Sequence, residues 1–122
     1  MKLASLLTVE QVILDVKSDD HWPAIVEMVE HLDRHNLLAE ENKEEVLAAL
    51  QAREDQISTG IGSGVAIPHA FSDKLEHVVA LFGRSKQGID FESLDNAPVN
   101  FVLLFLVPKK DYHLHLQTLA AI

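Results

Sequence analysis

The chain has 122 residues, the size of one domain, and its 10 basic and 19 acidic side chains give a formal net charge of −9. This balance, without any basic run, argues against a nucleic-acid or anionic-membrane surface and favours a basic partner. The chain has no cysteine, no signal-peptide pattern and no apolar run long enough to span a bilayer, so we expect one cytoplasmic domain without disulfides or membrane insertion.

The first half of the sequence predicts a strand and two helices. Residues 12–16 partly alternate between apolar and polar, which predicts a strand. Residues 18–20 offer N-cap oxygens to a helix that ends near Arg34, with an apolar face formed by Trp22, Ile25, Val26, Val29 and Leu32. Asn42, with Glu45 three residues on as a capping pair, predicts a second helix that ends near Arg53.

The second half predicts a sheet. Strands are expected at residues 65–67, at 78–82 up to Gly83, and at 101–107 up to Pro108, with turn-rich connectors at 88–91 and 94–98. The last strand is apolar on both faces and should lie centrally in a sheet covered on two sides. These elements predict one domain over residues 1–122, of the α/β or α+β class, with helices on both faces of the sheet.

The end of the sequence begins a helical face at Leu116 and stops at Ile122 after roughly two turns, short of an average helix. This pattern predicts a domain truncated at its C-terminus. A sheet face left uncovered in this way would favour a homodimer.

Residues 58–70, STGIGSGVAIPHA, carry the strongest functional signal. Gly60, Gly62 and Gly64 predict a shaped turn with exposed backbone N–H groups, and Pro68 places His69 at a strand end. Such groups next to a histidine suit a phosphoryl group or another anion on the imidazole, although a hydrogen-bonded strand-end histidine is the simpler alternative. The spacing matches neither a P-loop nor a dinucleotide fingerprint.

Two further features bear on this histidine. Arg53, which ends the second predicted helix, either stabilises the helix terminus or clamps phosphate oxygens with its guanidinium fork. His113 and His115 form an H-x-H pair that could complete a three-histidine zinc site with His69. The pair lies at a loop-to-helix junction, where such side chains diverge, and no carboxylate stands ready beside it, so we expect no metal.

The glycine-rich stretch is accompanied, in order along essentially the whole chain, by LQARE at 50–54, GIDF at 88–91, DNAPV at 95–99, LVP at 106–108 and HLQTLA at 115–120. This succession resembles the IIA domain of the bacterial phosphoenolpyruvate-dependent sugar phosphotransferase system, of the mannitol/fructose/nitrogen-regulatory type. The family fold is a mixed β-sheet between helices.

The resemblance implies a phosphoryl carrier without a cofactor, in which His69 accepts a phosphoryl group from the phosphohistidine of HPr, or of its nitrogen-branch relative, and passes it on to a IIB domain. It implies Arg53 as the cation near the phosphate and His115, which precedes an L-x-x-L pattern, as the second active-site histidine, with His113 as the alternative. The expected phosphate-binding residues are Ser58, Thr59, Gly60, Gly62, Gly64 and Ala70.

Two functions stay open at this point. One is a sugar-transport carrier acting through a IIB component, and the other is a regulatory protein whose phosphorylation state controls binding to a target protein. A histidine-based metal-binding domain is a minor third alternative.

Overall fold

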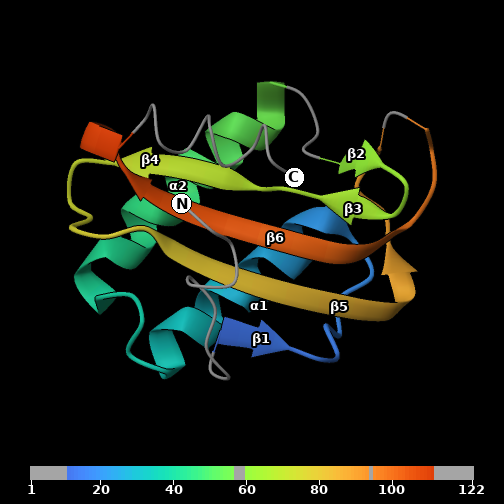
Figure 1. Cartoon of the computed structure of the whole chain (residues 1–122), viewed down its shortest axis with the longest axis horizontal. Helices are drawn as coiled ribbons and strands as arrows, with labels where there is room; N and C mark the ends of the chain where they lie inside the picture. Colours follow the sequence, from blue (N-terminus) through green and yellow to red (C-terminus); the bar gives the residue numbers. More distant parts are fainter. Residues whose placement is uncertain (1–10, 57–59, 94, 112–122) are drawn as a thin grey trace.

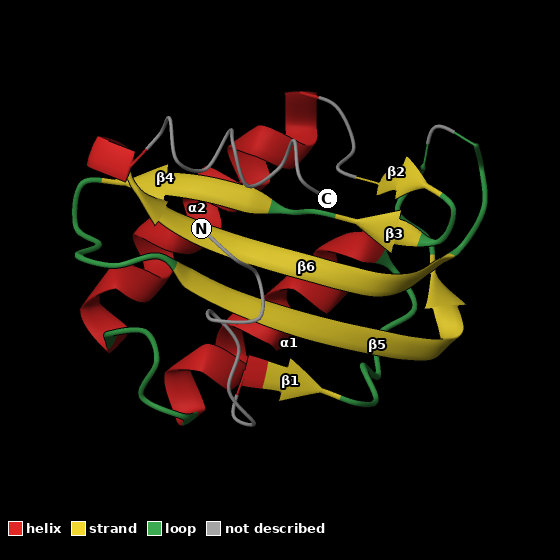
Figure 2. Ribbon diagram, viewed as in Figure 1, coloured by secondary structure: helices red, strands yellow, loops and turns green. Residues whose placement is uncertain are grey.

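The computed structural model describes residues 11–56, 60–93 and 95–111, which form a mixed α/β fold. Figures 1 and 2 show a sheet lying in front of two helices, α1 (His21–Arg34) and α2 (Lys43–Gln56). The strands are β1 (Val12–Ile13), β2 (Gly60–Gly62), β3 (Val65–Ala66), β4 (His69–Ser72), β5 (Val79–Ile89) and β6 (Val99–Pro108). The 3-10 helices η3 (Glu40–Asn42) and η4 (Lys109–Asp111) precede α2 and follow β6.

Strand β6 is the centre of the sheet. It pairs antiparallel with β5 on one side and parallel with both β3 and β4 on the other. Strand β1 adds in parallel to β5, and β2 adds in antiparallel to β3. The mixed sheet and the central position of the apolar run 101–107 confirm both predictions.

Helix α1 has the predicted N-cap. The Asp20 side chain accepts a hydrogen bond of 2.9 Å from the His21 N–H, and the buried residues of the helix recur at helical spacing: Ala24, Ile25, Met28, Val29 and Leu32. Helix α2 follows η3 directly, one residue after the predicted start, and continues three residues past Arg53. Its buried side chains are Val46, Leu50 and Glu54.

Alternate residues of β6 face opposite sides of the sheet. Val102, Leu104 and Leu106 join the core shared with both helices, whereas Leu103, Phe105 and Val107 join a second cluster on the other face. The two helices that the described residues contain therefore cover the same face. His69 pairs with Phe105, which directs the imidazole to the face opposite these helices.

Strand β5 extends well beyond the predicted end at Gly83. A Cβ atom at Gly83 would come within 3.0 Å of Met28 Cε in α1 and of Val16 Cγ2. Gly83 therefore marks a close approach of helix to sheet within a continuous strand.

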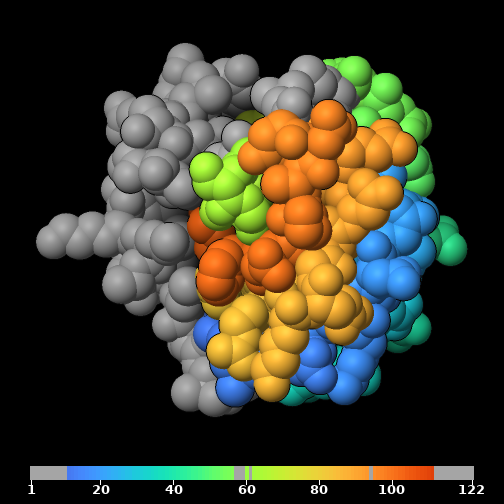
Figure 3. Space-filling view, turned by 90° about the vertical axis from the view of Figure 1, so that its right-hand side faces the viewer, coloured from blue at the N-terminus to red at the C-terminus, as the bar shows by residue number. Residues whose placement is uncertain are grey.

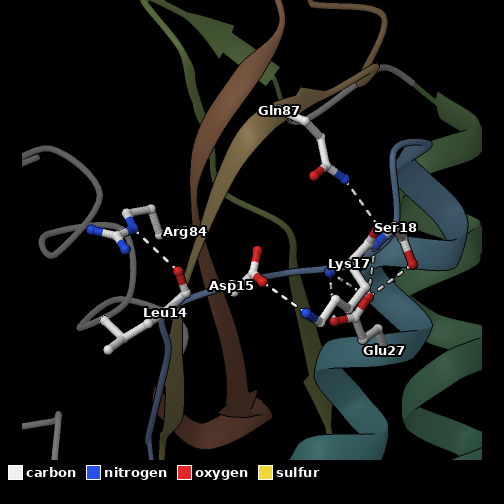
Figure 4. A network of polar contacts seen from close by, with 7 residues as sticks. All are labelled: Leu14, Asp15, Lys17, Ser18, Glu27, Arg84 and Gln87. Carbon is white, nitrogen blue, oxygen red and sulfur yellow. Dashed lines mark hydrogen bonds and ion pairs between the residues drawn. The ribbon is translucent and has the colours of Figure 1, made fainter.

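A polar network fixes the segment between β1 and α1 (Figure 4). The Glu27 carboxylate accepts hydrogen bonds from the N–H of Lys17 at 2.9 Å, from the N–H of Ser18 at 3.0 Å and from the Ser18 hydroxyl at 2.8 Å. Gln87 of β5 donates to the Lys17 carbonyl at 2.9 Å. These bonds join the beginning of α1 to the long strand β5.

Candidate functional site

His69 is the first residue of β4, which pairs only with β6 among the described strands. Strands β3 and β4 follow each other along the same side of β6, with a break at Ile67 and Pro68. The register continues across the break, because Ala66 and His69 pair with β6 residues three positions apart. Proline has no N–H to donate to a ladder, but the Pro68 carbonyl accepts a hydrogen bond of 3.0 Å from Phe105. His69 thus begins a second short strand after the break.

The backbone determines which imidazole nitrogen of His69 carries the proton. Nδ1 lies 2.8 Å from the carbonyl oxygen of Ile67, and since a carbonyl only accepts, Nδ1 donates. In the neutral ring the lone pair then lies on Nε2. The Phe71 ring packs edge-to-face against the imidazole, with ring centroids 6.2 Å apart. Nε2 is therefore the nucleophilic atom of this histidine.

Burial of the half-buried ring lowers the pKa of His69 below its ordinary value of 6.5, and the positive charge of Arg53 lowers this pKa further. The hydrogen bond to Ile67 and the negative charge of Glu54 oppose that change, but the pKa remains lowered. The imidazole is therefore neutral at pH 7, the form in which it is a nucleophile.

Arg53 and Glu54 lie in the last turn of α2, close enough for their charges to act on His69. The structure thus brings together two of the site residues expected from the sequence, His69 and Arg53. Glu54 is only 9% exposed and was not anticipated. In the sequence, the position of Glu54 next to Arg53 near the end of the helix was the only indication of its place at this site.

Helix α2 runs antiparallel to β4. At the end of β4 away from His69, the Ser72 hydroxyl donates a hydrogen bond of 2.8 Å to Glu45 near the start of α2. Glu45 and Arg53 are separated by about 12 Å of helix, and His69 and Ser72 by about 10 Å of strand. The two spacings agree, so the Ser72–Glu45 bond and the approach of Arg53 to His69 lie at opposite ends of the same α2–β4 contact.

The glycines of the predicted phosphate loop form the hairpin of β2 and β3. Gly62 pairs with Val65, whose partner on β6 lies four positions before the partner of His69, or about 13 Å along the strand. Gly62 and Gly64 have φ of 97° and 79°, which the hairpin turn requires. The structure does not bring these two glycines next to the imidazole.

The hairpin packs instead against the connection between β5 and β6 (Figure 3). A Cβ atom at Gly60 would overlap Ser93 Oγ and lie 3.2 Å from Phe91 Cβ. The Ser63 N–H donates a hydrogen bond of 3.0 Å to the Asp95 carboxylate. Gly60 pairs with Ala66 and lies nearer to His69 along the sheet than Gly62 does.

Ala70 follows His69 on β4, with its methyl group buried in the core that faces the helices. Ser58, Thr59, His113, His115 and the predicted C-terminal helix lie outside the described residues. Within the described parts of the chain, no group of three or more His, Cys, Asp or Glu side chains is arranged to hold a metal ion.

The described part of this site offers a neutral imidazole with its lone pair on Nε2 and a guanidinium nearby. Such a pair suits the transfer of a group that carries anionic oxygens, because the nitrogen supplies the nucleophile and the arginine interacts with the oxygens.

Comparison with known families decides the membership of the chain. The family model for "Phosphoenolpyruvate-dependent sugar phosphotransferase system, EIIA 2" matches residues 5–122. The chain belongs to this family. The resemblance inferred from the glycine-rich stretch and the motifs around it is confirmed.

Relatives of two kinds resemble this EIIA 2 chain. It is 38% identical over 120 residues to the fructose-specific EIIABC component of Bacillus subtilis, an alignment that covers 98% of this chain and 19% of that protein. It is 35% identical over 122 residues to the nitrogen regulatory protein of Bradyrhizobium diazoefficiens, with coverage of 100% and 78%. The chain therefore spans about a fifth of the fructose-specific relative and most of the nitrogen regulatory one.

Solved structures confirm the fold of this EIIA 2 chain. The nitrogen regulatory protein IIA-Ntr of Neisseria meningitidis superposes with a TM-score of 0.86 at 28% identity and covers 98% of this chain and 80% of that one. Enzyme IIAMTL of Escherichia coli, solved in complex with phosphorylated enzyme IIBMTL, gives a TM-score of 0.76 at 19% identity and covers 94% and 79%. Among the described residues, no helix combines the length and apolar composition that a bilayer crossing requires.

Proposed function

We propose that this chain is a phosphoryl carrier in which Nε2 of His69 accepts a phosphoryl group from an HPr-like phosphohistidine and passes it to an acceptor protein. The observation that carries the proposal is the hydrogen bond from Nδ1 to the Ile67 carbonyl, because it leaves the lone pair on Nε2. The lowered pKa of His69 supports it, since the ring accepts the group only while it is neutral.

In the accepting step the Nε2 lone pair forms a bond to phosphorus. The N–P bond of the donor breaks, and its electron pair returns to the donor imidazole. The proton of His69 stays on Nδ1, where the Ile67 carbonyl accepts its hydrogen bond. The phosphorylated ring therefore carries positive charge, which keeps the N–P bond reactive enough for the group to move on to a cysteine or histidine of a IIB domain.

Arg53 takes the role of the cation that binds the phosphoryl oxygens, since its charge already acts on His69. Backbone N–H groups of Ser58, Thr59 and Gly60 bind the same oxygens in this proposal, and His115 is the second imidazole. The N–H of Ala70 is directed to β6 by the parallel β4–β6 pairing, so Ala70 is not among the phosphate donors. Phosphoryl transfer needs little covalent assistance from a protein, so alignment and charge supply most of the rate.

Incubation of the full chain with enzyme I, HPr and phosphoenolpyruvate tests this assignment. We expect one phosphoryl group per chain on Nε2 of His69, identified by phosphorus and nitrogen NMR. His69→Ala abolishes labelling, whereas His77→Ala, which changes an exposed histidine between β4 and β5, leaves it intact. Normal labelling of His69→Ala, or phosphorus on Nδ1, would contradict the proposal.

Two acceptors are compatible with this carrier. A IIB component of the fructose type is one, in line with the name of the Bacillus subtilis relative. The other is a target protein whose binding depends on the phosphorylation state of this chain. The match to 78% of a nitrogen regulatory relative favours this second role. Transfer from phosphorylated His69 to a purified fructose-type IIB domain supports the first, and no transfer together with phosphorylation-dependent binding of a target supports the second.

A further inference from the structure

A groove crosses the end of the molecule where β4 stops and β5 begins. Its centre is a cavity of about 360 Å³ lined by residues of the α1–α2 connection and of the β4–β5 loop. Figure 1 shows these two segments at its left. The apolar part of its lining is formed by Leu37, Leu38, Leu75 and Val79. Two adjoining hollows share lining residues with this cavity, Glu41 on one side and Leu75 and Glu76 on the other. The three hollows therefore adjoin one another, and we refer to them together as the groove.

The carboxylates and the lysines of this groove differ in their ion pairing. Four carboxylates have no ion-pair partner among the described residues, namely Glu40, Glu41, Glu44 and Glu76. Three lysines are paired: Lys43 with Glu30 at 2.8 Å, Lys74 with Glu45 at 3.4 Å and Lys109 with Asp73 at 3.4 Å. Lys110, at one end of the groove, has no ion-pair partner within the described part of the chain. The groove thus presents an excess of uncompensated negative charge around an apolar centre.

We propose that this groove docks a basic segment of a partner protein, with an apolar side chain in the central cavity and flanking Arg or Lys residues against Glu41 and Glu76. An apolar centre with a charged rim is the usual anatomy of a protein interface. The rim charges determine which partners approach, and four unpaired carboxylates on a chain of net charge −9 select a basic one.

The groove is independent of the proposed phosphoryl site. His69 lies at the opposite end of β4, about 10 Å before Ser72, and lines none of the three hollows. The groove residues are not among those proposed to bind the phosphoryl group, so the docking proposal stands even if His69 carries no phosphoryl group.

A blocked peptide Arg-Leu-Arg-Arg-Leu-Arg is a suitable probe, titrated into the full chain with backbone amide signals followed by NMR. We expect shifts confined to residues 37–47, 73–79 and 108–110, and an affinity that falls as salt rises. The double variant Glu41→Gln/Glu76→Gln weakens binding about fivefold, as expected for the loss of two exposed charge pairs. Its labelling by HPr stays normal.

Three controls make the result specific. Glu92→Gln, which changes an exposed carboxylate in the β5–β6 connection, leaves the affinity unchanged. Peptides with Ser in place of Leu, or Glu in place of Arg, bind more weakly or not at all. The proposal would be overturned if Glu41→Gln/Glu76→Gln bound the peptide as tightly as the native chain, or if the native chain bound the Ser peptide as tightly as the Leu peptide. Shifts outside the groove, or no shift at millimolar peptide, would also overturn it. A second probe is hexylammonium, a small amine with an apolar chain. If hexylammonium bound in the central cavity and the peptide did not, the groove would be a site for small amines, and the proposal would be overturned.

Discussion

Ser72 lies three residues after His69 on β4, and its hydroxyl donates a hydrogen bond of 2.8 Å to Oε1 of Glu45. Ser72 is 2% exposed, so this bond lies where α2 packs against β4. It links the helix that carries Arg53 to the strand that carries His69.

Ser72→Ala should lower the free energy of unfolding by about 1 kcal/mol, the net value of one such hydrogen bond. It should also raise the pKa of Glu45, because the Ser72 hydrogen bond is the main cause of its lowering below 4.5. A carboxyl with a lowered folded pKa stabilises the native state above its unfolded pKa and loses that contribution as pH falls through the folded value. Urea unfolding between pH 7 and pH 3 should therefore show a smaller acid-induced loss of stability in Ser72→Ala than in the native chain.

Glu44→Gln is the matched control for this experiment, since Glu44 neighbours Glu45 and has no ion-pair partner among the described residues. It should leave the pH dependence of unfolding unchanged. Parallel stability curves for Ser72→Ala and the native chain would show that the hydroxyl does not hold the Glu45 carboxylate.

Arg53→Gln should raise the pKa of His69, because it removes a positive charge that disfavours imidazolium. NMR titration of the ring protons measures this change. Arg34→Gln, at the equivalent last turn of α1, is the control and should leave the His69 titration where it was.

The same lowered pKa predicts how phosphorylation of His69 depends on pH. Acceptance from HPr should stay constant from pH 8 down to about 6.5, the ordinary histidine value, and fall only as pH passes below the folded pKa. Native stability should also decline below that ordinary value, because the unfolded chain then binds a proton that the folded chain resists. Initial rates across pH, with HPr kept saturating, provide the measurement, and a decline that begins above pH 6.5 would contradict it.

Gly60→Ala should destabilise the fold by about 1–3 kcal/mol, the usual cost of an overpacked site. The added methyl group would overlap Ser93 Oγ and lie 3.0 Å from Ser93 Cβ. Ser93→Gly removes both atoms, so Gly60→Ala should cost less in that background. A double-mutant cycle of Gly60→Ala and Ser93→Gly, measured by thermal unfolding, tests this coupling. Additive losses of stability would show that the overlap with Ser93 is not the cause of the destabilisation.

Glu27→Gln should lower the free energy of unfolding by about 1–2 kcal/mol, since Lys17 and Ser18 lose a charged acceptor for their hydrogen bonds. Glu30→Gln on the same helix is the matched control. Glu30 pairs with Lys43 across a partly exposed surface, so its loss should change stability less. Equal denaturation midpoints for the two variants would show that the network adds no stability.

Elements set by neighbouring residues could be predicted from the sequence, whereas those set by distant contacts could not. The Asp20 cap and the apolar face after it are both local, and α1 begins where they indicate. A glycine at position 83 predicts the end of a strand. The strand continues, and a glycine fits there because the space that a Cβ atom at Gly83 would need is taken by Met28 of α1, which is distant in sequence. The sequence did not predict β4, because this strand depends on pairing with β6, which is distant in sequence.

The candidate site follows the same division. His69 and Arg53 could be inferred because their residue types fit phosphate chemistry and flank one loop. The prediction that Gly62 and Gly64 surround the histidine treated that loop as a compact turn around it. The β2–β3 pairing instead separates these glycines from the imidazole along the sheet, and no local signal reveals the register. Glu54 was missed because its burial depends on how α2 packs.

At the break between β3 and β4, a main-chain carbonyl selects the tautomer of His69. The ring proton is held by the main-chain oxygen of Ile67, and every amino acid at that position would provide the same oxygen. Sequence drift at position 67 can therefore alter packing without changing which nitrogen reacts. A change that moves the Ile67 carbonyl away from Nδ1 would remove this preference. The backbone conformation at the break therefore determines which nitrogen of His69 reacts.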